Sequence, residues 1–220
     1  MFDWHKIDDI FLDLDGTLLD LHFDNYFWKT HLPMCYASHH SMDLAQAKDW
    51  LTKELDAHRG KLSWYLTDLW SERLGVDIVA LKQEVAHKIG VRYSVIPFLH
   101  HLSHLGKRIS ITTNADHNSL ELKFSRTGIN KHVSAVYSSE EFGKPKEEEG
   151  YWQELIQAMR FDPERTLLID DNLAVLDSAH KFGIKHLIAI NRPDSQQPAR
   201  MIENYENIEF FDELYQPNRS

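Results

Sequence analysis

Disulfide bonds, long apolar runs and an excess of basic residues are all missing from this chain. Cys35 is the only cysteine among 220 residues, so no internal disulfide can form, and a reducing compartment such as the cytoplasm is the expected location. Lysine and arginine total 24 against 34 aspartates and glutamates, a net charge of −10. This balance argues against a nucleic-acid backbone or an anionic membrane surface as partner. No apolar stretch is long enough to predict a signal peptide or a membrane span.

The order of apolar patterns predicts an α/β fold. Residues 19–91 carry almost no strand signal but two helical stripes, with Ser41 as the predicted cap of the first and Gly75 as the stop of the second. The apolar members of the stripes are Leu44, Ala47, Leu51 and Leu55, and then Leu62, Tyr65, Leu66 and Leu69. Farther on, helical stripes alternate with short apolar runs at residues 109–113, 133–137, 166–169, 186–190 and 208–211. This alternation predicts a doubly wound, mostly parallel sheet that helices cover on both faces.

Two carboxylates, Asp13 and Asp15, follow the apolar run 10–12, and the chain then breaks at Gly16. The run predicts a buried strand, and the carboxyl ends of such strands are where open α/β sheets bind ligands. Two like charges buried there repel each other, and a hard cation such as Mg²⁺ would offset that repulsion while facing a phosphate. A calcium loop of the EF-hand type fits less well, because it needs a further ligand before its glycine and a glutamate at its end.

Three further polar clusters follow along the chain. They are Thr113 with Asn114, Lys144 with Lys146, and Asp170 with Asp171. Taken singly, they could be a β-branched residue before a turn, a solvated charged stretch and an acidic helix cap. Two apolar strands that each end in a carboxylate pair are harder to explain by chance. Brought together, the pairs would form an oxygen-rich site that suits Mg²⁺.

In this order the motifs resemble those of the haloacid dehalogenase-like hydrolase superfamily. The resemblance covers nearly the whole chain and consists of four motifs. In order, the first to the fourth are Asp13-Leu14-Asp15-Gly16-Thr17, Ile109-Ser110-Ile111-Thr112-Thr113-Asn114, Lys146 and Leu167-Leu168-Ile169-Asp170-Asp171. It implies a Rossmann-like α/β core formed by residues 1–18 and 92–220. It also implies an all-helical cap, residues 19–91, inserted between the first and second motifs.

A narrower resemblance concerns the segment Phe23 to Trp28, together with Trp64-Tyr65, Asp68-Leu69-Trp70-Ser71 and Leu74-Gly75. These residues are similar to the bacterial purine mononucleotidases of the superfamily, which dephosphorylate GMP and IMP. Aromatic and polar cap residues would stack on a purine and read its edge, namely Asn25, Tyr26, Phe27, Trp28, Trp64 and Tyr65. For any one of them, packing inside the cap is the competing interpretation.

The superfamily resemblance implies a role for each motif. Asp13 would be the nucleophile that forms an aspartyl-phosphate, and Asp15 the general acid and base. Thr113 and Asn114, with nearby backbone amides, would hold the phosphoryl oxygens, and Lys146 would neutralise their charge.

The metal ligands implied are the carboxylate of Asp13, the backbone carbonyl of Asp15 and the carboxylate of Asp171. Asp170 would be a further ligand or would support one. Asp177 would support the metal ligands without binding the metal itself.

The third motif leaves a choice of lysine. Lys144 precedes Pro145, as in the Lys-Pro of many family members, whereas Lys146 precedes Glu147. The family's lysine usually stands six residues before an aromatic, and Trp152 occupies that position relative to Lys146. This spacing favours Lys146.

We therefore expect a Mg²⁺-dependent phosphomonoester hydrolase that acts on a small molecule, specifically a purine nucleoside 5′-monophosphate. A sugar-phosphate phosphatase or a phosphomutase of the same superfamily would use the same carboxylates. A carbon–halogen hydrolase would need neither Asp15 nor a metal. A receiver module also combines an acceptor aspartate, acidic metal ligands, threonine and lysine, but it has no large helical insertion after its first strand.

Overall fold

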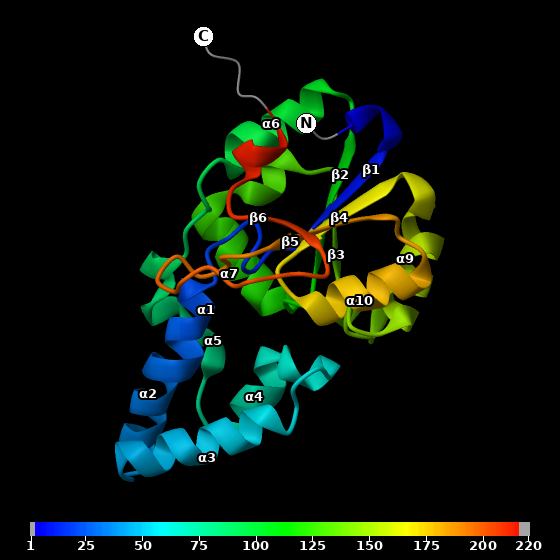
Figure 1. Cartoon of the computed structure of the whole chain (residues 1–220). Helices are drawn as coiled ribbons and strands as arrows, with labels where there is room; N and C mark the ends of the chain where they lie inside the picture. Colours follow the sequence, from blue (N-terminus) through cyan, green and yellow to red (C-terminus); the bar gives the residue numbers. More distant parts are fainter. Residues whose placement is uncertain (1–2, 216–220) are drawn as a thin grey trace.

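The computed structural model describes residues 3–215, and its centre is one sheet of six parallel strands (Figure 1). The strand order is β3-β2-β1-β4-β5-β6. The strands are β1 (Asp9–Leu12), β2 (Arg108–Thr113), β3 (Ala135–Ser138), β4 (Thr166–Asp170), β5 (His186–Ile190) and β6 (Glu206–Ile208). This is the order of doubly wound nucleotide-binding sheets, so the predicted fold class is confirmed. The ends of the predicted core, residues 1–2 and 216–220, lie outside the described residues.

Helices cover both faces of the sheet because its strands alternate apolar side chains between them. Ile10 and Leu12 of β1 pack toward helices α6 (Val95–His104) and α7 (His117–Thr127), whereas Phe11 packs toward α9 (Glu149–Met159) and α10 (Leu173–Phe182). A shorter helix, α8 (Ser139–Phe142), follows β3. Single helical turns complete the core at Trp4–Lys6, Ile129–His132, Pro163–Arg165 and Phe211–Leu214.

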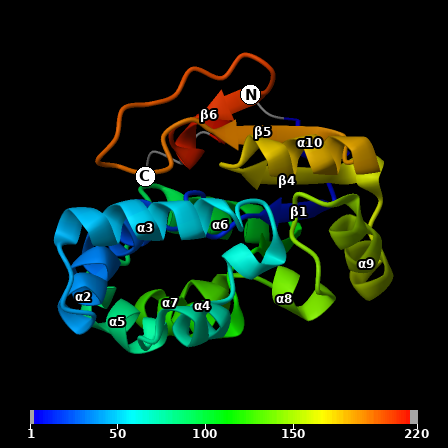
Figure 2. The same ribbon diagram turned by 90° about the horizontal axis from the view of Figure 1, so that it is seen from below.

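The segment between β1 and α6 is helical and lies at one end of the sheet, below the core in Figure 1 and nearest the viewer in Figure 2. Leu19 and Val91 form an isolated antiparallel bridge where the chain leaves the core and returns to it. The elements are α1 (His22–Tyr26), a π-helical turn (Phe27–His31), α2 (Leu32–His39), α3 (Leu44–Asp56), a turn at Leu62–Trp64, α4 (Thr67–Leu74), α5 (Ile78–Glu84) and a turn at Ala86–Lys88. We call residues 19–91 the cap; where the cap ends and the core begins stays a prediction.

The cap has an apolar core of its own. Phe23, Phe27, Trp70 and Ile78 are buried together with residues of α2 and α3. Trp70 is fully buried, and its indole nitrogen donates to the carbonyl of Trp64 at 3.0 Å. The cap therefore has the buried apolar surface that holds a small helical domain together.

Local differences from the sequence prediction have identifiable causes. Asp43, not Ser41, caps α3, because Ser41 has a positive φ of 51° while the Asp43 carboxylate accepts from the backbone of Ala45 at 2.8 Å. The stripe 62–69 is not one helix, since α4 begins only at Thr67, whose backbone donates to the core residue Asp116 at 2.7 Å. The predicted stop at Gly75 is confirmed.

Two predicted strands were misplaced. The run 208–211 is not a strand throughout, because β6 ends at Ile208 and Phe211 begins a helical turn. The run 133–137 is displaced, because β3 begins at Ala135 and continues to Ser138. None of the described helices is long and apolar enough to cross a membrane.

Candidate active site

The carboxyl ends of β1 and β4 lie side by side, where the strand order of the sheet reverses. The Asp13 backbone donates to the carbonyl of Ile169 at 3.0 Å, which fixes the two strand ends against each other. Asp13, Asp170 and Asp171 each present a carboxylate oxygen there, all within 4.8 Å of one another. The topology thus joins the two predicted carboxylate pairs in one cluster.

The buried ammonium of Lys146 lies between two of these carboxylates. Its Nζ is 2.6 Å from Asp13 Oδ1 and 2.7 Å from Asp170 Oδ2, and it also donates to the carbonyl of Thr112 at 2.9 Å. Trp152 of α9 donates its indole N–H to the Lys146 carbonyl at 3.1 Å and so fixes the backbone of this lysine. Lys144, by contrast, pairs with Glu154 on the surface at 2.9 Å.

Burial dominates the electrostatics of this cluster. It raises the pKa of Asp13 to about 7, against the opposing effect of Lys146. Burial also raises the pKa of Asp171, and the neighbouring Asp13 and Asp170 raise it further. For Lys146 burial disfavours the charge, but the ion pairs with Asp13 and Asp170 outweigh it and raise its pKa well above the usual range.

The cluster fits a hard divalent cation. Lys146 pairs with only two of the three carboxylates, and Asp13 Oδ2 is buried with no hydrogen-bond partner among the described residues. Oxygen ligands of this kind, with room for waters and a phosphate, are what Mg²⁺ prefers. Gly16 makes the close approach possible. It has a φ of +90°, and a Cβ there would lie 2.7 Å from Asp171 Cγ.

Asp15 lies beside this cluster and contacts a lysine that the motifs did not indicate. Its Oδ2 is 2.7 Å from Nζ of Lys123, a buried residue of α7, while its Oδ1 is buried without a partner. Burial raises the pKa of Asp15 to about 6, with Lys123 acting against it. The only sequence signal for Lys123 is its position on the apolar stripe of α7, three residues after Leu120.

The second motif forms the wall next to Lys146. Thr113 accepts from the backbone of Ala115 at 3.0 Å, and Asn114 Oδ1 accepts from the backbone of Lys146 at 2.9 Å. The Asn114 amide donates to Glu147 at 2.9 Å. Both Thr113 and Asn114 line the cleft described next, so their predicted neighbourhood with Lys146 is observed.

Glu147 is the second residue that the motifs did not indicate. Its carboxylate also accepts from the Asn172 amide at 3.1 Å and from the hydroxyl of Tyr65 in the cap at 2.6 Å. It therefore joins the second motif, the fourth motif and the cap in one network. It is the first of three consecutive glutamates, Glu147 to Glu149, and the sequence carries no signal that distinguishes it from the other two.

A cleft of about 860 Å³ extends from the aspartates into the cap. Four of the predicted cap residues line it: Asn25, Trp28, Trp64 and Tyr65. Tyr26 does not; the Lys88 ammonium lies 4.2 Å from the centre of its ring, on another side of the helix. Phe27 is fully buried in the cap core. The structure therefore does not bring Tyr26 and Phe27 to the cleft with the other four, since consecutive positions of a helix face different directions.

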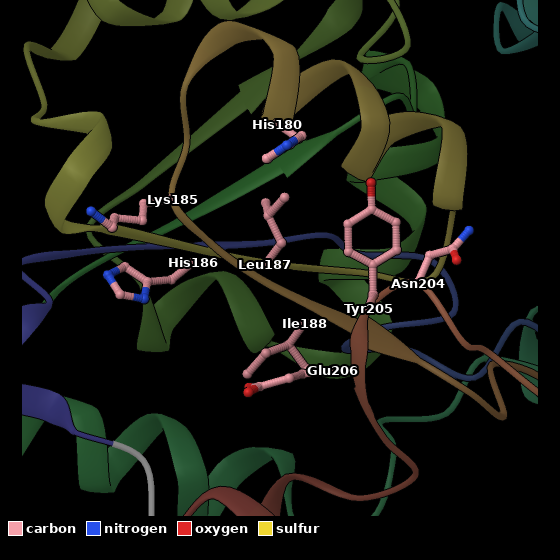
Figure 3. Close-up of a pocket in the computed structure, with 8 residues that line it drawn as sticks. All are labelled: His180, Lys185, His186, Leu187, Ile188, Asn204, Tyr205 and Glu206. Carbon is pink, nitrogen blue, oxygen red and sulfur yellow. The ribbon is translucent and has the colours of Figure 1, made fainter.

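A second, smaller hollow of about 390 Å³ lies away from the aspartates, beside α10, β5 and β6 (Figure 3). Its walls include His180, Lys185 and Tyr205, and none of the predicted active-site residues. The Tyr205 hydroxyl donates to Asp177 of α10. Asp177 is exposed, and its support of the active site stays a prediction.

Known proteins are similar to this chain in sequence and in architecture. The model of the haloacid dehalogenase-like hydrolase family matches residues 7–183. GMP/IMP nucleotidase YrfG from Escherichia coli (strain K12) is 38% identical over 192 residues, covering 87% of this chain and 86% of that protein, and its namesake from Shigella flexneri matches equally. The chain therefore belongs to the haloacid dehalogenase-like hydrolase family. The predicted resemblance is confirmed, and with it the prediction that the chain is an enzyme.

Solved structures share the fold at lower identity. A HAD phosphatase from Thermococcus onnurineus has a TM-score of 0.78 at 20% identity, covering 94% of this chain and 96% of its own. The HAD-hydrolase YfnB from Bacillus subtilis, whose structure is bound to magnesium, has a TM-score of 0.63 at 18% identity, covering 95% and 97%.

The two lysines of the third motif allow a direct test. We expect Lys146→Ala to lower kcat by about 10²-fold or more, because it removes the ammonium that offsets the two buried carboxylates of Asp13 and Asp170. Lys144→Ala removes an exposed ion pair and should leave kcat within about twofold. Steady-state phosphate release by the two purified variants measures the difference. A crippled Lys144 variant beside an active Lys146 variant would contradict the assignment.

Proposed function

We propose that this protein is a Mg²⁺-dependent phosphomonoester hydrolase whose substrate is a purine nucleoside 5′-monophosphate, with GMP and IMP preferred. The observation that carries the proposal is the juxtaposition of Asp13, Asp15 and Lys146 at the base of a cleft whose far wall is the aromatic cap. The 38% identity to a GMP/IMP nucleotidase over most of both chains supports it. A cytoplasmic location stays a prediction.

The metal would be held by Asp13, Asp170 and Asp171, with the backbone carbonyl of Asp15. When bound, Mg²⁺ supplies positive charge that screens these carboxylates from each other and from the phosphoryl oxygens. Lys146 adds a fixed positive charge at Asp13 Oδ1. Together these charges let an anionic nucleophile approach an anionic substrate.

In the first step, an oxygen of the Asp13 carboxylate attacks phosphorus and the bond from phosphorus to the ribose 5′-oxygen breaks. Asp15 donates its proton to that leaving oxygen, so the nucleoside departs as a neutral alcohol. In the second step, Asp15 takes a proton from water while the water oxygen attacks phosphorus. The bond to Asp13 breaks, inorganic phosphate leaves, and both carboxylates return to their starting state.

The cap supplies the features that favour a nucleotide over a smaller phosphate ester. Trp28 and Trp64 line the cleft away from the aspartates and present apolar surface on which a base can stack. The contact between Tyr65 and Glu147 closes the cap over the phosphoryl site and keeps bulk water from the phosphoenzyme. A sugar phosphate would meet the same carboxylates but would leave the aromatic wall unused.

The nucleophile assignment is tested by replacing Asp13 with asparagine, the side chain closest to aspartate in shape. We expect Asp13→Asn to fold like the wild type and to lose about 10³-fold or more in kcat, because an amide cannot form the acyl phosphate. Phosphate release measures the loss, and circular dichroism with thermal unfolding checks the fold. Hydrolysis near the wild-type rate by the folded variant would refute the nucleophile assignment.

Metal dependence is tested by chelation. Activity should vanish in EDTA and return when Mg²⁺ is added in excess, because no side chain can replace the cation among three carboxylates. Asp171→Ala should raise the Mg²⁺ concentration for half-maximal rate by about tenfold or more. Full activity in EDTA would contradict the metal site.

Base preference tests the purine assignment. We expect kcat/KM to be higher for purine than for pyrimidine 5′-monophosphates, because the larger ring system gains more from stacking. We expect GMP and IMP to exceed AMP, because polar groups matched to a 6-oxo edge are left unpaired by a 6-amino edge. Phosphate release from GMP, IMP, AMP, CMP, UMP and a set of sugar phosphates gives the ranking. Equal rates for all nucleotides, or faster cleavage of a sugar phosphate, would remove the purine assignment and leave the phosphatase chemistry intact.

A further inference from the structure

A chain of buried charges leads from Asp15 into the cap. Nζ of Lys123 on α7 lies 2.7 Å from Asp15 Oδ2 and 2.9 Å from Oδ2 of Asp24 on α1. The Lys123 side chain is only 2% exposed. Moving an ammonium out of water is costly unless anions compensate for it, and here two carboxylates do so. The three groups therefore hold one another in fixed positions.

A second lysine, Lys82, contacts Asp24, the cap residue in this series of charged groups. Nζ of Lys82 on α5 lies 3.4 Å from Asp24 Oδ1 and 3.1 Å from Ser119 Oγ on α7. Asp24 thus has one oxygen facing each lysine, and Lys82 contacts Asp24 without contacting Asp15 in the described contacts. The two lysines share a carboxylate partner, but only one of them contacts Asp15.

The geometry points to Lys123 as a positioning residue for the general acid, an inference that rests on the proposed function. Lys123 holds Oδ2 of Asp15. Oδ1, which has no hydrogen-bond partner among the described residues, is then the oxygen that gives its proton to the leaving group and afterwards takes one from water. Asp24 holds Lys123 from the cap side. The orientation of Asp15 thereby depends on a residue of the cap.

The leaving group separates this role from a purely structural one. A ribose 5′-alkoxide is strongly basic and needs the proton of Asp15 as its bond to phosphorus breaks, whereas p-nitrophenolate is a stable anion and leaves without it. Attack by Asp13 is common to both substrates. A variant in which Asp15 is misplaced should lose the first step with GMP and keep it with p-nitrophenyl phosphate.

The experiment measures single-turnover release of guanosine and of p-nitrophenol, with enzyme in saturating excess, for the wild type and Lys123→Met. We expect guanosine release to slow by about 10²-fold and p-nitrophenol release by no more than about threefold. Equal slowing of both, or no slowing with GMP, would overturn the inference. If the wild type releases neither product, the proposed function itself fails, which is a distinguishable result.

Two further variants act as controls. Lys82→Met removes the other buried ammonium from Asp24 and should slow both releases by the same factor; a loss confined to GMP would refute the specific role of Lys123. The double variant Lys123→Met/Asp24→Asn keeps the net charge of the cluster, because one cation and one anion are removed together. It takes the place of the single variant if Lys123→Met does not fold, and it should show the same dependence on the leaving group.

Discussion

The ion pairs of Lys146 with Asp13 and Asp170 are the interaction on which the rest of the site depends. Parallel pairing of β1 with β4 brings these carboxylates together inside the protein, where their repulsion would be costly without a cation. Lys146 is held in turn by the indole of Trp152, which belongs to the apolar layer of α9 and α10. Packing on one face of the sheet therefore determines where the charge at its end is located.

Glu147 and Lys123 extend this dependence to the cap. Glu147 follows Lys146 directly and binds Tyr65, while Lys123 joins Asp15 to Asp24. The cap is thus attached through residues that also contact the candidate active site, and not only through apolar surface. The same side chains hold the cap in place and arrange the site.

The sequence predicted what depends on local pattern. Asp13 and Asp170 end short apolar runs, and such runs become buried strands whose ends meet in a parallel sheet, so both fold class and carboxylate cluster could be inferred. The positions of Lys123 and Glu147 in the site could not be inferred, because a lysine or glutamate becomes buried only when distant segments supply its partners. The resemblance identified the whole segment that contains Tyr26, whereas the helix presents only some positions of that segment, such as Asn25 and Trp28, to the cleft.

A chain of net charge −10 is a poor general attractor for a phosphate ester, and the cleft resolves this by its own composition. Seven basic residues line it: Lys29, Lys48, Arg59, Lys82, Lys123, Lys146 and Arg200. Seven acidic residues line it as well: Asp13, Asp15, Asp24, Asp56, Glu147, Asp170 and Asp171. A divalent cation bound to the aspartates would make the local balance positive, so that the field inside the cleft opposes that of the surface. The excess negative charge then lies elsewhere on the molecule, away from the cleft.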